Sequence, residues 1–180
     1  MLQIRTPYLI FLGEAHDQLA GKTGVGVAQW RPDACVGQMR LPGCKADAGL
    51  PDLTLEEAAE KGAKTLLIGT TTRGGRINAE WQKLMIRAIE LGMDVASGLH
   101  DRIADQPAVA EAAKLHGRAV HDVRHPKDVF PVGTGVKRAG KRVLTVGTDC
   151  SIGKMFTGLA LERDMQAAGM KATFRATGQT

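Results

Sequence analysis

The chain has 180 residues, of which 43% are hydrophobic and 24% are charged, and its formal net charge is +5. This balance is typical of a folded chain with room for one domain or slightly more. No apolar run reaches membrane-spanning length, residues 1–5 do not resemble a signal peptide, and the three cysteines lack a Cys-x-x-Cys spacing. We therefore expect a reduced, cytoplasmic protein with no membrane partner. Only 4% of the residues are aromatic and no base-stacking motif is present, so we expect no nucleic-acid partner either.

Strands and helices alternate over the first 125 residues. The pattern of apolar residues predicts strands at 8–12, 65–68, 94–96 and 118–123, and helices at about 55–61, 77–91 and 107–116. Thr54 and Glu57 have the spacing of a capping box and mark the start of the first of these helices. Such alternation predicts a parallel sheet covered by helices on both faces. The expected fold class is α/β, with a Rossmann-like first domain over residues 1–135.

Three segments of this part lack a clear period. Gly21-Lys22-Thr23 resembles the end of a phosphate loop, but Gly13 is too far upstream and two further glycines follow, so we expect a plain turn. Residues 30–44 mix apolar residues with prolines, which predicts an ordered, partly buried loop near the sheet edge. Cys35 and Cys44 within it are interpreted as packed small hydrophobes. Residues 126–141 are rich in proline, glycine and cations and read as a connecting segment, with the linker proper at 136–141.

One loop of the first domain is a candidate ligand site. The fingerprint Gly-x-Gly-x-x-Gly does not follow the first strand, so NAD is not expected. Residues 69–76 leave the carboxyl end of a strand and precede a helix, where ligands bind in open α/β sheets. The candidate residues for a carboxylate or phosphate are Arg73, Gly74, Gly75 and Arg76. A glycine-rich turn with solvated arginines is the alternative. His100, on the next loop, is either an acid or base or a hydrogen-bonded structural histidine.

Residues 142–180 predict the beginning of a second domain, of the P-loop NTPase-like α/β type. A strand at 143–146, a helix at 152–168 and a strand at 171–175 would form a β-loop-α-β unit. The loop inside it has two glycines followed by a lysine, which is typical of phosphate-binding loops. Its candidate ligand-binding residues are Gly147, Thr148, Asp149, Cys150, Ser151, Gly153, Lys154 and Met155.

The residue types of this loop suit a phosphorylated ligand. Glycines let backbone N–H groups surround a phosphate, the helix dipole favours an anion, and the lysine supplies a mobile ammonium. Met155 stands where a Ser or Thr would bind Mg²⁺, and a thioether is a poor ligand for that ion. The loop therefore predicts phosphate binding more firmly than ATP hydrolysis. A purely structural turn is the alternative. Cys150 is read as a small residue that the loop tolerates, with a nucleophile as the alternative.

Dense motifs along the whole chain resemble those of the DUF1611 proteins and, within them, the D-glutamate N-acetyltransferase type. The resemblance implies a Rossmann-like amino-terminal domain and a P-loop carboxy-terminal domain that is similar to dethiobiotin synthetase. Members of the family are longer, which implies either that this chain is carboxy-terminally truncated or that its short P-loop part packs on the first domain or on a partner. The motifs are at 8–13, 22–24, 30–32, 35–38, 41–44, 69–75, 97–100, 147–150, 153–155 and 175–180.

Three function hypotheses follow. The resemblance implies an acyltransferase that moves acetyl from acetyl-CoA to D-glutamate, with CoA phosphates in the loop and a glutamate carboxylate at Arg73 or Arg76. The loop alone is also compatible with an ATP-dependent ligase or kinase acting on a carboxylate, for which Met155 makes Mg²⁺ doubtful, or with a non-catalytic nucleotide-binding module. No general base can be identified from the sequence. We further expect a homo-oligomer, because the helix at 152–168 and the strand at 171–175 would leave an apolar stripe and a sheet edge uncovered.

Overall fold

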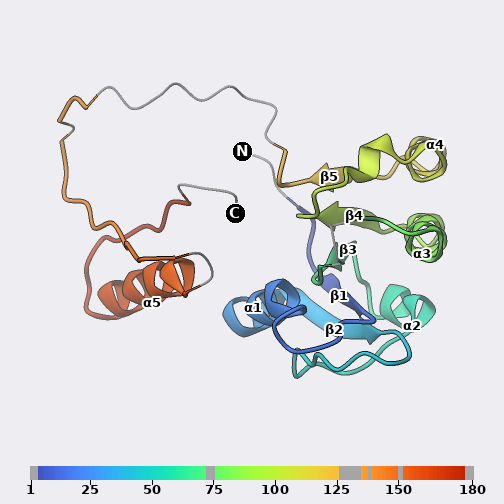
Figure 1. Ribbon diagram of the computed structural model, residues 1–180, viewed down its shortest axis with the longest axis horizontal. Coiled ribbons are helices and arrows are strands. Elements are labelled where there is room, and N and C mark those ends of the chain that lie inside the picture. The colour runs from blue at the N-terminus through green and yellow to red at the C-terminus, as the bar shows by residue number, and fades with distance from the viewer. Residues whose placement is uncertain (1–3, 72–75, 126–134, 138, 150–151, 177–180) are drawn as a thin grey trace. The chain divides into compact units, whose positions relative to one another are not determined.

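The computed structural model describes residues 4–71, 76–125, 135–137, 139–149 and 152–176 (Figure 1). The chain divides into two compact units, residues 1–127 and residues 128–180. Each unit has its own arrangement and is described by itself.

The first unit is built on a five-stranded parallel sheet with the strand order β2-β1-β3-β4-β5. Its strands are β1 (Tyr8–Gly13), β2 (Cys35–Arg40), β3 (Thr65–Ile68), β4 (Asp94–Ser97) and β5 (Val120–Asp122). The predicted α/β fold with a parallel sheet is confirmed. From β1 the chain first adds β2 on one side and then returns to add β3 on the other, so the direction of winding reverses between β1 and β3. In this strand order, ligands bind at the carboxyl end of that switch point.

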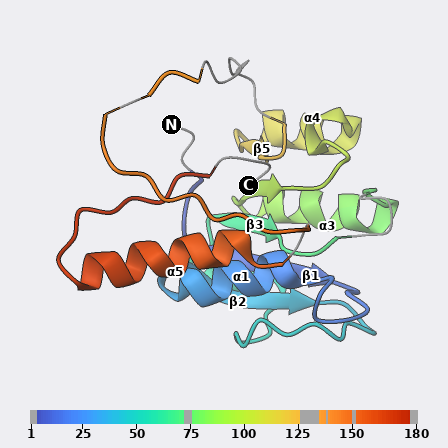
Figure 2. The same ribbon diagram turned by 60° about the vertical axis from the view of Figure 1, so that its left-hand side comes forward.

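Helices cover both faces of the sheet (Figures 1 and 2). Helix α1 (Lys22–Trp30) lies on one face, and α2 (Leu55–Glu60), α3 (Ala79–Glu90) and α4 (Pro107–Leu115) lie on the other. Two short 3-10 helices, η1 (Pro32–Ala34) and η3 (Ile103–Asp105), complete the unit's described helices. The predicted capping box of α2 is present, with the Thr54 side chain accepting from the Glu57 N–H and the Glu57 side chain accepting from the Thr54 N–H.

The residues of β1 alternate between two apolar clusters. Leu9 and Phe11 face the larger cluster, which α2, α3 and α4 complete, whereas Ile10 and Leu12 face a smaller one beside α1. This follows from the two-residue period of a strand, and it shows why β1 is apolar throughout. Cys35 and Cys44 are partly buried and pack against the smaller cluster.

The segment after Gly21 is the helix α1, and the prediction of a plain turn there was wrong. Glycine has a low helix propensity, so Gly24 and Gly26 argued against a helix. In the structure a Cβ added to Gly24 would lie 2.6 Å from Ile10 Cγ2, so only glycine lets the helix approach the sheet this closely. Both glycines are buried, and packing on the sheet outweighs the propensity.

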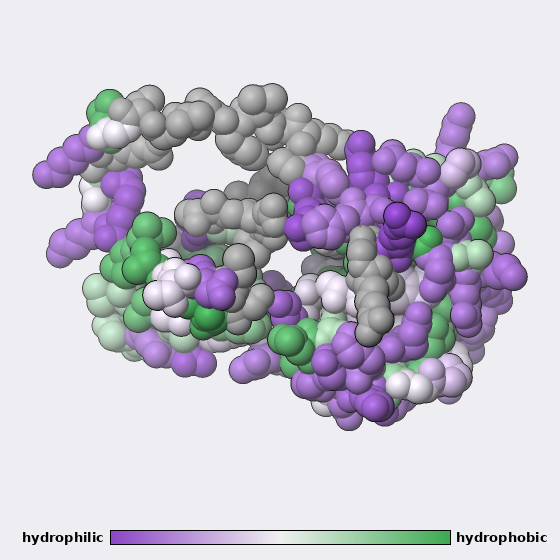
Figure 3. All heavy atoms as spheres, in the orientation of Figure 1, coloured by the Kyte–Doolittle hydropathy of each residue, from purple (hydrophilic) through white to green (hydrophobic). Residues whose placement is uncertain are grey.

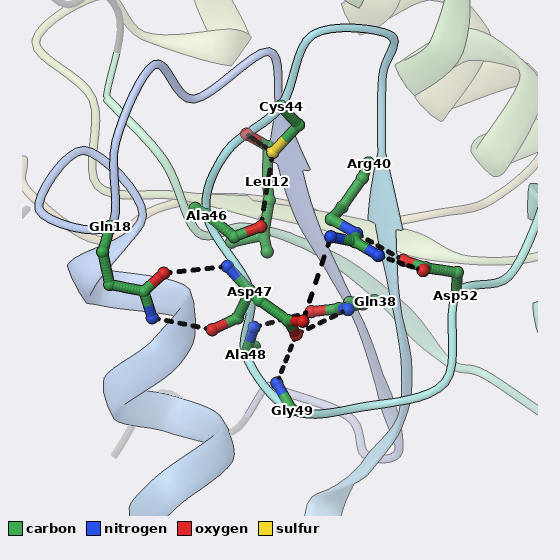
Figure 4. Close-up of polar contacts among 10 residues, drawn as sticks. All are labelled: Leu12, Gln18, Gln38, Arg40, Cys44, Ala46, Asp47, Ala48, Gly49 and Asp52. Carbon is green, nitrogen blue, oxygen red and sulfur yellow. Dashed lines mark hydrogen bonds and ion pairs between the residues drawn. The ribbon is translucent and has the colours of Figure 1, made fainter.

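Residues 30–44 do not form the predicted loop, because β2 runs through them as an edge strand. The sequence of β2 lacks the run of apolar residues that is typical of a buried strand, since its buried positions are Gly37 and the polar Gln38. Gln38 is 1% exposed, and its side chain donates to Asp47 Oδ1 at 3.0 Å and accepts from the Ala48 N–H at 2.7 Å (Figure 4). Its backbone also pairs with Pro51 and Leu53, at 2.9 and 2.8 Å, so this segment covers the outer edge of β2.

The second unit contains α5 (Lys154–Ala167), which begins two residues later than predicted. Gly169 follows its end with φ +77°, a left-handed conformation that favours glycine and terminates helices. The strands predicted at 143–146 and 171–175 are not formed. A parallel strand needs hydrogen-bonded neighbours, and in the described residues these segments instead bond to α5. Thr145 Oγ1 donates to the Lys154 carbonyl at 3.0 Å, and the Phe174 N–H donates to Glu162 Oε1 at 2.7 Å.

Many large apolar side chains in the described part of this second unit are exposed, and green atoms are visible over the region of α5 in Figure 3. No residue of α5 is buried. Among the described residues, no helix of the chain is both long and apolar enough to cross a membrane.

Candidate functional site

The carboxyl edge of the sheet gathers the loops that follow β1, β3 and β4. Glu14 follows β1 directly, residues 69–76 follow β3, and residues 98–102 follow β4. The loop after β3 is the one for which a ligand was predicted. It lies at the switch point between β1 and β3, as the topology requires of such a site.

The first part of the loop after β3 is bonded to the beginning of α1. The Gly24 N–H donates to the Gly69 carbonyl at 2.8 Å, and the Thr71 N–H and the Thr70 hydroxyl both donate to the Ala20 carbonyl, at 3.1 and 3.2 Å. A Cβ on Gly69 would lie 2.6 Å from Gly24 Cα, so this contact depends on both glycines. The Gly24 N–H is among the donors that a dinucleotide-binding fold offers to pyrophosphate, and here it is engaged within the protein.

The end of the same loop is held from two directions. Asp101 Oδ2, on the loop after β4, accepts from the Ile77 N–H at 3.1 Å. Asn78 then caps α3, because its Oδ1 accepts from the Trp81 N–H at 2.8 Å. Arg76 is exposed and immediately precedes these anchored residues. Arg73, Gly74 and Gly75 lie outside the described residues.

Trp81 connects this loop to β1. Its indole Nε1–H donates to Glu14 Oε2 at 3.0 Å. The indole is 1% exposed, and it meets the Phe11 ring edge-on with 5.0 Å between centroids. The sequence offered no signal for the Glu14 contact, which joins residues 67 positions apart.

His100 is exposed, and the structure records its main-chain oxygen as an acceptor from His125 Nε2 at 3.0 Å. This contact joins the loop after β4 to the segment after β5. The contact uses the backbone of His100 and not its ring, so both interpretations of the ring stay open.

The predicted phosphate loop leads into α5. Gly153 is the N-cap with φ +95°, a conformation that favours glycine, and Lys154 is the first helical residue. Lys154 Nζ donates to the Asp149 carbonyl and so folds back over the loop. Gly147, Thr148 and Asp149 are exposed, and Met155 is 38% exposed. Cys150 and Ser151 lie outside the described residues.

Two further observations concern this loop and the described residues around it. Five residues separate Gly147 from Gly153, one more than in the common pattern Gly-x-x-x-x-Gly-Lys, so the motif by itself is less specific than that pattern. Within the described residues, no group of three or more His, Cys, Asp or Glu side chains is placed to hold a metal ion.

A Rossmann-like sheet followed by a phosphate-type loop and helix defines the class of two-domain α/β proteins with a P-loop. Two family models match the chain, and together they cover most of it. One is described as the domain of unknown function DUF1611_N, Rossmann-like domain, at residues 39–126, and the other as DUF1611_C, P-loop domain, at residues 131–180. The chain belongs to the DUF1611 family.

Two curated relatives are similar over nearly all of the chain. A D-glutamate N-acetyltransferase of Tritonibacter scottomollicae is 57% identical over 177 residues, which are 98% of this chain and 53% of the relative. Another D-glutamate N-acetyltransferase, of a Pseudoalteromonas species, is 43% identical over 99% of this chain and 54% of the relative. The crystal structure of a DUF1611 family protein from Anabaena variabilis is 28% identical with a TM-score of 0.78, over 98% of this chain and 54% of its own. The chain thus spans about half the length of the proteins it matches.

Proposed function

We propose that the protein is an enzyme that transfers acetyl from acetyl-CoA to the amino group of D-glutamate, in the cytoplasm. The observation that carries this proposal is the 57% identity with a D-glutamate N-acetyltransferase over 98% of the chain. Both candidate loops, 69–76 and 147–155, lie in a chain that is matched almost from end to end. The relatives are nearly twice as long, so their activity is carried to this chain as a proposal only.

The loop at 147–155 is the proposed site for the phosphates of the cofactor. The beginning of α5 supplies N–H groups and a positive dipole end, and Lys154 supplies an ammonium close to the same point. Acetyl-CoA carries its acetyl group as a thioester, which an amine can attack. Its phosphates require no Mg²⁺ for binding, so Met155 at the position of the usual metal-binding hydroxyl is compatible with this cofactor.

The loop at 69–76 is the proposed site for the anionic acceptor. A guanidinium binds a carboxylate through two parallel hydrogen bonds, and Arg76 stands at the carboxyl edge of the sheet where such a ligand would enter. Arg73 is the second candidate for the same role. D-glutamate carries two carboxylates, so the charge of this loop matches the acceptor's charge.

A second candidate function is an ATP-dependent ligase or kinase that acts on a carboxylate. The match of residues 131–180 to a P-loop domain favours it, because such domains commonly bind nucleoside triphosphates. Met155 argues against it, since the hydroxyl that would bind Mg²⁺ is missing. A non-catalytic nucleotide-binding module is the third possibility, and the experiment below separates all three.

Calorimetric titration of one protein sample with acetyl-CoA and with ATP–Mg²⁺ tests the proposal. We expect acetyl-CoA to bind with an affinity that EDTA leaves unchanged, and mass spectrometry to detect N-acetylglutamate after D-glutamate is added. ATP binding that EDTA abolishes, with no acetyl-CoA binding, would establish the ligase or kinase. Nucleotide binding without any product would support the non-catalytic module.

A further inference from the structure

Glu14 is an exposed carboxylate whose direction is fixed by a buried side chain of another element. It is the first residue after β1, at the switch point of the sheet. Its Oε2 accepts from Trp81 Nε1 at 3.0 Å, while the side chain remains open to solvent. An exposed glutamate ordinarily samples several rotamers, and a hydrogen bond to a rigid partner removes much of that freedom.

Trp81 is such a rigid partner. Its side chain is 1% exposed, and its ring packs at right angles to Phe11, with an interplanar angle of 89°. A Cβ on Gly13 would lie 2.8 Å from Trp81 Cζ2, so the indole lies directly against the end of β1. The carboxylate of Glu14 is therefore placed before any ligand arrives.

The start of α3 connects this carboxylate to the segment that carries Arg76, because Trp81 bonds to Glu14 from the first turn of the helix. Trp81 is the third residue of α3, and Arg76 lies two residues before the N-cap Asn78. Asp101 fixes the Ile77 N–H next to Arg76 at 3.1 Å. A free amino acid carries a carboxylate and an ammonium on the same carbon, so a cation and an anion that lie near each other would complement it.

A simpler account of Glu14 is that it only accepts the hydrogen bond of the buried indole. An uncharged oxygen would satisfy that N–H equally well, because one neutral acceptor is enough for one indole donor. The charge of Glu14 would then have no role. The two accounts differ in what happens when the charge is removed and the oxygen is kept.

We propose that Glu14 binds the ammonium group of the acceptor amino acid, whose carboxylate lies at Arg76. The inference rests on the proposed function, since it requires an amino acid as the acceptor. It assigns to Glu14 the discrimination between amino acids and simple dicarboxylates. A carboxylate that faces an ammonium forms a charge-assisted hydrogen bond, which is stronger than one between neutral groups.

The variant Glu14→Gln tests the proposal, because glutamine retains an oxygen that accepts from Trp81 Nε1 and loses the charge. Two ligands are titrated by calorimetry: D-glutamate, and glutarate, which has the same two carboxylates and no ammonium. We expect the variant to bind D-glutamate about tenfold to a hundredfold more weakly, and glutarate at least as tightly as wild type does. Glu80→Gln, an exposed glutamate in the first turn of α3, is the matched control and should leave both affinities unchanged.

Each contrary outcome has a separate meaning. If Glu14→Gln bound D-glutamate and glutarate equally more weakly, Glu14 would be only a structural hydrogen-bond acceptor for Trp81. If both affinities were unchanged, Glu14 would not belong to the binding site. If Glu80→Gln weakened D-glutamate binding as much as Glu14→Gln does, the effect would come from the overall charge of this region and not from a specific contact of Glu14. Wild-type protein that binds acetyl-CoA and glutarate but not D-glutamate would overturn the acceptor assignment itself.

Discussion

At the scale of single residues, Lys154 is the side chain on which we expect phosphate binding to depend most. Its ammonium contacts the Asp149 carbonyl, so a phosphate must take over a contact that the loop already provides. We expect Lys154→Ala to weaken acetyl-CoA binding by about 1.5–3 kcal/mol, the usual contribution of a hydrogen bond to a charged group. Calorimetry measures this loss directly.

The matched control for Lys154 is Lys171→Ala, an exposed lysine of the same unit. It removes the same charge at a distance from the loop, so the affinity should change by only a few tenths of a kcal/mol. Equal affinities of the wild type and Lys154→Ala would mean that residues 147–155 are a structural turn.

At the scale of elements, the pair of Arg5 and Asp94 joins the segment before β1 to the start of β4. Arg5 Nε donates to Asp94 Oδ2 at 2.5 Å, and the Ala119 N–H donates to Asp94 Oδ1 at 2.8 Å. The carboxylate side chain is only 4% exposed, whereas that of Arg5 is 43% exposed. Burial by itself would raise the pKa of Asp94, but the hydrogen bonds from Arg5 and Ala119, together with nearby positive charge, outweigh it and hold that pKa below its ordinary value of 3.8.

The lowered pKa fixes the direction of the pH dependence. A carboxylate with a lowered folded-state pKa stabilises the protein fully above its ordinary pKa, and this stabilisation is lost as the pH falls through the folded-state value. We expect Asp94→Asn to lower the free energy of unfolding by roughly 1–3 kcal/mol at neutral pH, less than for a fully buried pair because Arg5 is partly exposed. The difference from wild type should begin to shrink as the pH falls below about 4 and should disappear only below the folded-state pKa of Asp94.

Urea unfolding at a series of pH values measures this dependence. Asp105→Asn, at an exposed carboxylate in η3, is the control and should change the stability little at any pH. A deficit of Asp94→Asn that persisted undiminished at acid pH would show that the charge of Asp94 is not what stabilises this contact.

The elements also show where reasoning from sequence succeeds. Residues 8–12 and 65–68 were predicted as strands because a parallel strand that is buried on both faces must be apolar throughout. Helix α1 and strand β2 were missed because Gly24 and Gln38 are explained by contacts with distant residues, namely Ile10 and the segment at 47–53. The composition of a segment does not predict which distant residues it will contact.

The candidate site was likewise predictable from the sequence only in part. Strand-to-helix order was enough to place the loop at 69–76 at the carboxyl edge of the sheet, because that follows from topology. The hydrogen bonds of Asp101 to Ile77 and of Trp81 to Glu14 span 24 and 67 positions, and no periodicity predicts them. The strands expected at 143–146 and 171–175 had the right composition, but composition does not supply a hydrogen-bonding neighbour.

At the scale of the whole molecule, the apolar surface of the second unit leads to a prediction about assembly. Val143, Leu144 and Val146 are 70%, 69% and 79% exposed, and Ile152 and Met170 are also more than half exposed. A monomeric protein rarely leaves so many large apolar side chains of one small unit in water, since burying each would stabilise it by about 1.5–3 kcal/mol. We propose that a second copy of the chain covers them in a symmetric homo-oligomer built on dimers, as most closed homo-oligomers are.

Sedimentation velocity at micromolar concentration decides whether this assembly forms. We expect a mass at least twice that of the 19.2 kDa chain, and a shift toward the monomer in Val146→Glu, which places a charge on the proposed contact surface. Leu115→Glu is the matched control, because Leu115 is an equally exposed apolar residue, at 79%, but ends α4 in the first unit. A wild-type chain that sediments as a monomer of 19.2 kDa would instead mean that this apolar surface tolerates solvent, and would remove self-association as the reason for its composition.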